Sequence, residues 1–369
     1  MPEALRLVPE LAVERCTRYR YRYSACSRCA DQCPHQALTP GEDGVRLDPV
    51  RCQGCALCDA ACATGVFKAP NLSLAVPSDP SVRQISIACV PSEQPGDVRV
   101  PCLGALTPAP LAGLGQRGFA VTLRGSAHCE RCPNAPQGAA RLEALLDALA
   151  SVPAGPGPIE GETLPRAPWL TPILDDERSR QGLDRRRAER RHFFRGLLAR
   201  GIEAATEDAK PSAEVPAMAI RAAALQVPSR RRLGETLWRR HGDPALEDPL
   251  AGLTWGLGWV EVGPNPCTGC EACARVCPTG ALKVSEADQQ WELIHSAAQC
   301  VGCGVCTEAC HAGAIALHHG RPAAAPDWSL LHRMRRFRCE RCGRYFVGVD
   351  AADCPVCLDD EEGFAAIFG

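Results

Sequence analysis

The chain has 369 residues, a formal net charge of −2 and 24 cysteines, and this length allows two or three domains. The cysteines are grouped in runs with short spacers, which favours metal ligation over the disulfide framework of a small secreted protein. The sequence has no apolar run of about 18 residues, and its start lacks the regions of a signal peptide. We therefore expect a cytoplasmic protein without a membrane span.

Seven cysteines near the N-terminus follow the spacing of two-cluster bacterial ferredoxins. A complete C-x2-C-x2-C-x3-C motif consists of Cys52, Cys55, Cys58 and Cys62. The second, third and fourth positions of an upstream motif are Cys26, Cys29 and Cys33, and Pro34 follows them. In such proteins the fourth cysteine of each motif ligates the cluster of the other motif. We predict a two-cluster ferredoxin-like module over residues 1–75.

The first ligand of the upstream motif is missing from its usual place. Cys16 is the only cysteine further upstream, and the nine residues TRYRYRYSA separate it from Cys26. We interpret Cys16 as the ligand and TRYRYRYSA as an insertion; the alternative is a free Cys16 beside a three-cysteine cluster. One predicted cluster uses Cys16, Cys26, Cys29 and Cys62, and the other uses Cys33, Cys52, Cys55 and Cys58. The alternation of Tyr and Arg predicts a short strand whose arginines screen cluster charge, bind an acidic partner or, most commonly, face solvent.

The sequence pattern of residues 83–150 predicts a small α/β domain. The segments QISIACV, DVRVPC and FAVTLRG are typical of buried strands, and TPAPLAGLGQRG and GAARLEALLDALA are typical of helices. This alternation favours a parallel sheet. A GxGxxG match at 113–118 lies between a helix and a following strand, which reverses the order of the dinucleotide fingerprint, so we expect no nucleotide site.

Four cysteines follow the predicted strands of this domain: Cys89, Cys102, Cys129 and Cys132. The carboxyl ends of parallel strands share one edge, so we expect these cysteines to converge there. Their spacing resembles that of the delta subunit of methyl-viologen-reducing hydrogenases, which implies a 2Fe-2S centre. A 4Fe-4S cluster, Zn and four buried thiols without metal remain alternatives.

Residues 151–250 lack cysteine and are rich in Pro, Arg and Ala, which predicts a helical linker. An apolar stripe between Phe193 and Ile202 predicts a helix that packs on a neighbouring domain. Residues 178–240 carry a formal charge of +9, which leaves −11 for the remainder. We expect this stretch to bind acidic surface, either of a partner or of the cluster-bearing domains themselves. A solvated or acid-paired face is favoured over nucleic-acid binding by the arginine triplets at 185–187 and 230–232.

Two complete motifs lie in the C-terminal half: Cys267, Cys270, Cys273 and Cys277, and then Cys300, Cys303, Cys306 and Cys310. They predict a second two-cluster ferredoxin-like module over residues 255–320. The exchange of fourth ligands predicts that Cys310 joins the first three cysteines and that Cys277 joins the second group.

The last four cysteines, Cys339, Cys342, Cys354 and Cys357, form two CxxC knuckles within residues 335–360. This spacing predicts a tetrahedral four-sulfur site similar to a zinc ribbon or the tail of a rubrerythrin. Both Zn and Fe accept four thiolates, and we favour Zn.

The predicted fold class is α+β multidomain: two ferredoxin-like modules, a small parallel-sheet domain between them and a C-terminal four-cysteine ribbon. The segments YRYRYSACSRCADQCP and VPCLGALTPAPL and the paired motif after WVEVGPNPC carry a further likeness. They resemble polyferredoxin-like 4Fe-4S proteins of proteobacteria associated with molybdenum-dependent formate dehydrogenases. The resemblance implies a formate dehydrogenase as partner.

Several cluster types in one chain, without paired carboxylates or a pocket signature, favour a conduit for single electrons over a catalyst. Such a protein is an accessory or a subunit of an oxidoreductase. The alternative is an assembly or maturation factor that donates labile clusters. We expect redox protein partners and no nucleic acid.

Overall fold

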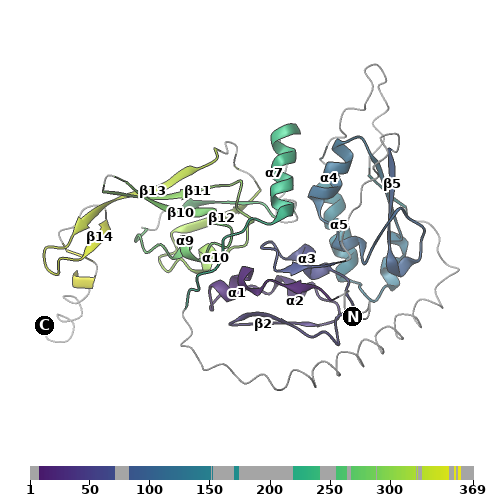
Figure 1. Cartoon of the computed structure of the whole chain (residues 1–369), viewed down its shortest axis with the longest axis horizontal. Helices are drawn as coiled ribbons and strands as arrows, with labels where there is room; N and C mark the ends of the chain where they lie inside the picture. The colour runs from purple at the N-terminus through teal and green to yellow at the C-terminus, as the bar shows by residue number, and fades with distance from the viewer. Residues whose placement is uncertain are drawn as a thin grey trace, which may run out of the picture.

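The computed structural model describes residues 8–70, 83–150, 152, 170–173, 219–241, 255–263, 267–287, 289–320, 322, 326–348, 353–354 and 356–358. The apolar stripe at 193–202 and the triplet at 185–187 lie outside the described residues. Figure 1 shows the N-terminal segment (8–70) beneath helix α7, the middle segment (83–150 with 170–173) on one side and the C-terminal segment (255–320) on the other. The tail (326–358) extends from the C-terminal segment.

The N-terminal segment is built from short strands and single helical turns. Its elements are β1 (Glu10–Leu11), η2 (Val13–Arg15), α1 (Thr17–Arg20), α2 (Arg28–Asp31), β2 (Leu38–Gly41), β3 (Gly44–Leu47), α3 (Leu57–Ala61) and β4 (Phe67–Lys68). Strands β2 and β3 form an antiparallel hairpin, and β1 pairs antiparallel with β4. The first and last strands therefore close the segment around its cysteines.

The C-terminal segment repeats this order of elements apart from η2 and α1. It contains β9 (Gly258–Val262), α9 (Ala272–Val276), β10 (Leu282–Ala287), β11 (Gln290–His295), α10 (Val305–Glu308) and β12 (Ile315–His319). Strand β9 pairs with β12, and β10 pairs with β11. In the tail, β13 (Ser329–Arg338) and β14 (Tyr345–Gly348) continue this hairpin into a sheet of order β10-β11-β13-β14.

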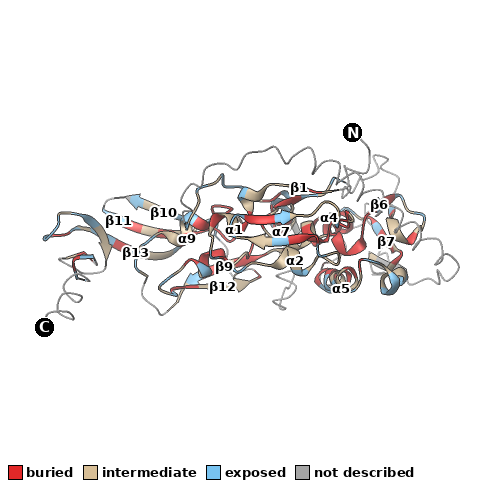
Figure 2. Cartoon of the chain, turned by 90° about the horizontal axis from the view of Figure 1, so that it is seen from below, coloured by how far each residue is buried: buried red, intermediate tan, exposed pale blue. Residues whose placement is uncertain are grey.

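The middle segment contains the predicted parallel sheet. Its strands are β5 (Gln84–Cys89), β6 (Val98–Val100), β7 (Ala120–Arg124) and β8 (Leu170–Ile173), in the order β6-β5-β7-β8. Helices α4 (Pro108–Gln116) and α5 (Gln137–Ala150) and the 3-10 turns η3 (Val90–Ser92), η4 (Leu103–Ala105) and η5 (Ser126–Arg131) complete it. Buried residues concentrate around α4, α5 and β7 (Figure 2). The predicted strands, helices and parallel pairing are confirmed.

Helix α7 (Ser229–His241) joins the three segments. Its Trp238 lies in the core of the middle segment, and Arg230 donates to the Asp59 carbonyl oxygen of the N-terminal segment at 2.7 Å. Arg231 donates to the carbonyl oxygens of Ala297 and Cys300 in the C-terminal segment, at 2.7 and 2.9 Å. The described part of the arginine-rich stretch therefore binds the chain's own segments.

The strand predicted for TRYRYRYSA is wrong. The amide N–H of Arg20 donates to the carbonyl of Cys16 at 3.1 Å, and that of Tyr21 donates to Thr17 at 2.8 Å, which closes the helical turn α1. The buried positions within TRYRYRYSA are Thr17, Arg20 and Ser24, a helical spacing rather than alternation. The expectation that these arginines all face solvent is wrong as well, because Arg20 is only 1% exposed.

Candidate metal centres

All 24 cysteines lie in the described residues. We name six groups by their place along the molecule. Site A is Cys89, Cys102, Cys129 and Cys132; site B is Cys33, Cys52, Cys55 and Cys58; site C is Cys16, Cys26, Cys29 and Cys62; site D is Cys277, Cys300, Cys303 and Cys306; site E is Cys267, Cys270, Cys273 and Cys310; site F is Cys339, Cys342, Cys354 and Cys357.

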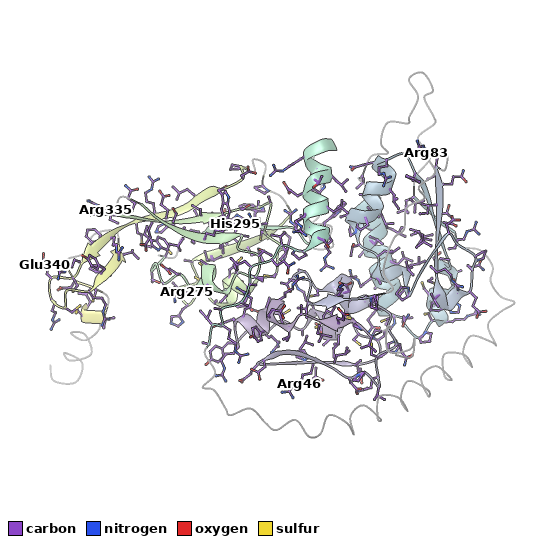
Figure 3. All side chains as sticks on the ribbon, in the orientation of Figure 1. Arg46, Arg83, Arg275, His295, Arg335 and Glu340 are labelled. Carbon is purple, nitrogen blue, oxygen red and sulfur yellow. The ribbon has the colours of Figure 1, made fainter. Side chains whose placement is uncertain are left out.

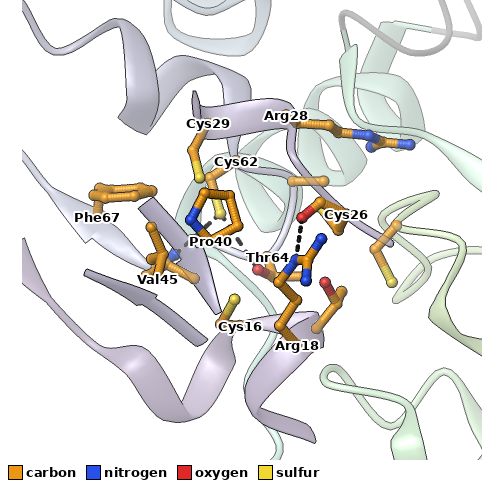
Figure 4. A pocket seen from close by; sticks show the side chains of 14 residues that line it. Cys16, Arg18, Cys26, Arg28, Cys29, Pro40, Val45, Cys62, Thr64 and Phe67 are labelled. Atoms are coloured by element: carbon orange, nitrogen blue, oxygen red, sulfur yellow. Dashed lines mark hydrogen bonds between the residues drawn. The ribbon is translucent and has the colours of Figure 1, made fainter. Parts of the chain in front are cut away.

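The four cysteines of site C line one cavity, shown in Figure 4. Helix α1 begins directly after Cys16, while α2 carries Cys29 and α3 ends directly before Cys62. Burial raises the pKa of Cys29 to about 12, and the thiols of Cys62, Cys16 and Cys26 add to this shift. The structure thus places Cys16 where the predicted ligand set requires it. Its ligation of a cluster stays a prediction.

The nine-residue insertion is closed by one of its own arginines. The Nε of Arg18 donates to the carbonyl oxygen of Cys26 at 2.6 Å, as the dashed line in Figure 4 indicates. This bond returns the chain to the cavity after the detour through α1. A nine-residue spacer can therefore present Cys16 and Cys26 to the same site.

Cys33 and Cys58 of site B share a hydrophobic core with Cys16, Cys29 and Cys62 of site C. Burial raises the pKa of Cys55 to about 12, and the neighbouring thiols of Cys52 and Cys33 raise it further. The pKa of Cys58 is raised by burial, by the thiols of Cys55 and Cys52, by the carboxylate of Asp59 and by the thiol of Cys33. Cys33 therefore groups with the second motif, as the predicted exchange of fourth ligands requires.

In the C-terminal segment, the neighbouring thiols follow the same predicted grouping. Burial raises the pKa of Cys300 to about 12, and Cys277 is the thiol that adds to this shift. Burial also raises the pKa of Cys273 to about 12, with contributions from Cys267, Cys270 and Cys310. Because such buried thiols are neutral at pH 7, a metal must displace their protons in order to bind.

In three motifs, a backbone N–H group donates to the sulfur of the fourth cysteine. Ala37 donates to Cys33 at 3.3 Å, Val66 to Cys62 at 3.4 Å and Ala314 to Cys310 at 3.2 Å. Each bond joins the fourth cysteine of a motif to the N–H four residues later. Such donors stabilise negative charge on thiolate ligands and tune the potential of a cluster.

Site F differs from sites A to E in its tight packing. Its four Sγ atoms all lie within 4.8 Å of one another, with Cys339 to Cys357 at 3.9 Å and Cys342 to Cys354 at 3.7 Å. A tetrahedral ion with metal–sulfur bonds of about 2.3 Å requires sulfur atoms about 3.8 Å apart. In the described part of the chain, no other group of three or more Cys, His, Asp or Glu ligands is this compact. Site F therefore fits a single metal ion.

The electrostatics of site F also favour a metal. The backbone N–H of Cys342 and those of Cys354 and Arg341 lower the pKa of Cys339 to about 7, against the opposing effect of burial. The Cys354 N–H lies 3.3 Å from the Cys339 sulfur. These donors favour the thiolate of Cys339, which assists binding of a cation, whereas burial and the neighbouring thiols raise the pKa of Cys357 to about 12.

Site A forms at one edge of the parallel sheet. Cys89 ends β5, Cys102 precedes η4, and Cys129 and Cys132 belong to η5 and its end. Burial raises the pKa of Cys102, and the thiols of Cys132, Cys55 and Cys89 add to the shift. Gly125, at φ 97°, leaves room for this group, because a Cβ there would lie 2.9 Å from the Cys89 sulfur. The structure thus brings Cys89 and Cys132 near Cys102, while the convergence of all four cysteines and the metal at site A stay predictions.

The sequence did not predict the contacts that two arginines make at these sites. Arg20 is buried beside Cys277 and Cys303, and Arg28 donates to the carbonyl oxygen of Gly302 at 3.4 Å. Their contacts lie more than 250 residues away in the sequence. The Tyr–Arg alternation gave the single local signal, and it pointed to a strand.

Comparison with known families identifies one part of the chain. A family described as a 4Fe-4S dicluster domain matches residues 266–315, which contain sites D and E. No curated protein is similar enough in sequence to match the chain. No helix within the described residues is long and apolar enough to cross a bilayer. The dicluster domain and the cysteine groups fit an iron–sulfur protein of the polyferredoxin type and support a role in electron transfer.

Proposed function

We propose that the chain carries single electrons between redox protein partners through four 4Fe-4S clusters, held at sites B, C, D and E. It acts as an accessory or subunit of an oxidoreductase, such as a molybdenum-dependent formate dehydrogenase. The observation that carries the proposal is the shared architecture of the two cysteine-rich segments. Apart from η2 and α1, both have the same order of elements and the same strand pairing, and the C-terminal one matches a dicluster domain.

The chemistry of the donor sets supports this function. Each of sites B to E has four thiol donors, the ligand set of a 4Fe-4S cluster. Site A supplies four more thiols for a 2Fe-2S or a further 4Fe-4S cluster, and site F supplies the geometry for one Zn or Fe ion. In this proposal, residues 1–75 and 255–320 are two-cluster modules, 83–150 hold site A, 151–250 link them and 335–360 hold site F.

Burial favours retention of the clusters over their donation. In site D, Cys277 and Cys306 are buried, and in site B, Cys52, Cys55 and Cys58 are buried. A scaffold that donates clusters must let an acceptor thiol reach the iron, whereas an electron carrier needs only close approach of its partner. Electron transfer is therefore the better supported function, and assembly of other iron–sulfur proteins is the alternative.

Repeated redox cycles in the presence of an apo-ferredoxin distinguish these two functions. Protein purified without oxygen is reduced and reoxidised ten times beside the apo-acceptor, and then the two proteins are separated. An electron carrier keeps its iron and sulfide and returns to its starting spectrum. Transfer of most of the iron to the acceptor would instead establish a maturation factor.

A further inference from the structure

Sites C and D meet at the interface between the two cysteine-rich segments. Cys303 of site D lines the same cavity as the four cysteines of site C. Arg28 lines this cavity as well, and both of its terminal nitrogens lie 3.4 Å from the carbonyl oxygen of Gly302, the residue before Cys303. In Figure 4, Arg28 points away from the sulfur atoms of site C. The two sites are therefore neighbours, although their sequence motifs are far apart.

Arg20 is the buried cation at this interface. Its Nε donates to the carbonyl oxygen of Val276 at 3.0 Å, and its Nη1 has no hydrogen-bond partner among the described residues. Burial lowers the pKa of Arg20, and the nearby sulfur atoms of Cys277 and Cys303 act in the opposite direction. A buried guanidinium with an unpaired nitrogen is costly unless negative charge lies near it. Metal-bound thiolates of Cys277 and Cys303 at site D would supply that charge.

A second contact connects site B with site A. Cys55 of site B and Cys102 of site A belong to one buried hydrophobic cluster with Leu57 and Ala105. The ring Nε2 of His35 and the Oδ1 of Asn134 are 2.9 Å apart and join the same two segments. Site A therefore lies against the N-terminal segment on the side of site B.

Inside each cysteine-rich segment, the two sites share a hydrophobic core. The core of the N-terminal segment contains cysteines of both site B and site C, including Cys58 and Cys16. The core of the C-terminal segment contains cysteines of both site D and site E, including Cys306 and Cys273. The contacts thus give one spatial order, A–B–C–D–E.

We propose that sites A to E form a single electron relay in this order, with Arg20 as the positioning residue at the junction of C and D. This inference rests on the proposed function, because it requires clusters at these sites. In the step across the junction, a reduced cluster at C loses one electron as an oxidised cluster at D gains it, so no other reactant is needed. Arg20 stabilises the additional negative charge at D.

Substitution of Arg20 tests this role through the reduction potential. Arg20→Met removes the charge, and Arg20→Lys keeps it. Arg46→Met is the matched control, because Arg46 is exposed on β3 of the same segment (Figure 3). In potentiometric titrations followed by electron paramagnetic resonance, we expect Arg20→Met to lower the reduced-to-oxidised ratio of one cluster about tenfold at fixed potential. That ratio corresponds to 59 mV for a one-electron couple.

Arg20→Lys should restore most of the wild-type potential, and Arg46→Met should leave all potentials unchanged. An Arg20→Met protein with full iron and sulfide and unshifted potentials would overturn the role of Arg20. If Arg20→Met loses clusters and Arg20→Lys keeps them, the role of Arg20 is supported. Lysine retains the positive charge but not the planar set of N–H donors of the guanidinium group.

The magnetic interaction between reduced clusters tests the order of the relay without any change at Arg20. In the fully reduced full-length protein, spin relaxation of the cluster at C should be faster than in a variant that lacks site D through Cys300→Ser and Cys306→Ser. Equal relaxation in the two proteins would overturn the contact between C and D. Absence of acid-labile sulfide would instead remove the proposed function itself, so the two failures are distinguishable.

Discussion

The two cysteine-rich segments differ most in their first motif. Nine residues separate Cys16 from Cys26 in the N-terminal segment, whereas two separate Cys267 from Cys270 in the C-terminal segment. The longer spacer folds into α1 and sends Arg20 into the opposite segment. The comparison shows that a ligand can keep its place in a metal site while the chain beside it becomes an interface.

The shorter spacer packs against a different part of the molecule, the tail. A Cβ at Gly269, which has a φ of 67°, would collide with Val347 of β14 and lie 3.0 Å from Met334 of β13. The loop of site E therefore packs closely against the tail, and glycine is required at this contact. Cys270 remains exposed, whereas Cys16 is buried. Site E thus lies at an accessible end of the cysteine array, and site C lies inside it.

The largest expected effect comes from replacing with serine the first cysteine of the first motif in each cysteine-rich segment. If the segments are equivalent, Cys16→Ser and its matched variant Cys267→Ser each remove one cluster, or about four Fe. Serine oxygen is a harder ligand that deprotonates less readily than thiol, so the cluster is lost or changes its potential. Iron and sulfide assays with electron paramagnetic resonance measure both.

In each variant the other cysteine-rich segment should keep its clusters. If Cys16→Ser retains the iron content and spectrum of the wild type while Cys267→Ser loses a cluster, then Cys16 is a free thiol. The N-terminal segment would then hold a three-cysteine site.

A smaller effect is expected where α7 holds the segments together. Arg231→Met removes two hydrogen bonds to backbone carbonyls and a 3.3 Å ion pair with Glu235, all around a side chain that is 2% exposed. Removing a buried charged partner costs about 3 kcal/mol, whereas the exposed neighbour Arg232→Met should cost less than about 0.5 kcal/mol. Anaerobic thermal unfolding followed by circular dichroism compares the two. Equal melting temperatures would show that α7 does not stabilise the C-terminal segment.

The smallest effect is a pH dependence confined to the C-terminal segment. Burial lowers the pKa of His295 to about 4, so this ring resists protonation in the folded protein. In the unfolded chain it titrates near pH 6.5, and stability therefore falls as the pH drops below that value. Between pH 7.5 and 5.5 the loss is about 1 kcal/mol. His295→Gln should remove this part of the acid sensitivity, whereas His318→Gln, at a half-exposed ring on β12, should not. Identical pH profiles for His295→Gln and wild type would contradict this prediction.

Local patterns in the sequence predicted much of this molecule. Ligand spacing is a local property, so the motifs indicated the groupings of sites B to F before any tertiary structure was considered. The middle sheet was predictable because its apolar strands and its helix at 137–150 have distinct periodicities. The carboxyl edge of that sheet then placed Cys89 and Cys102 near Cys129.

Contacts between distant segments were not predictable in this way. The alternation of Tyr and Arg suggested a strand. The burial of Arg20 against Val276 instead favours a helical turn, so tertiary packing overrides the alternating pattern. The positive charge of residues 178–240 indicated that this stretch binds acidic surface. It could not indicate that Arg231 binds neutral carbonyl oxygens.

Total metal content with acid-labile sulfide tests the central claim most directly. Four clusters at sites B to E predict about 16 Fe and 16 sulfide per chain in anaerobically purified protein. Site A adds about two or four Fe, and site F adds about one Zn or Fe without sulfide. Low-temperature electron paramagnetic resonance of the reduced protein should show interacting clusters. Fewer than about 12 Fe after reconstitution would contradict two complete modules, and zinc throughout without sulfide would contradict electron transfer altogether.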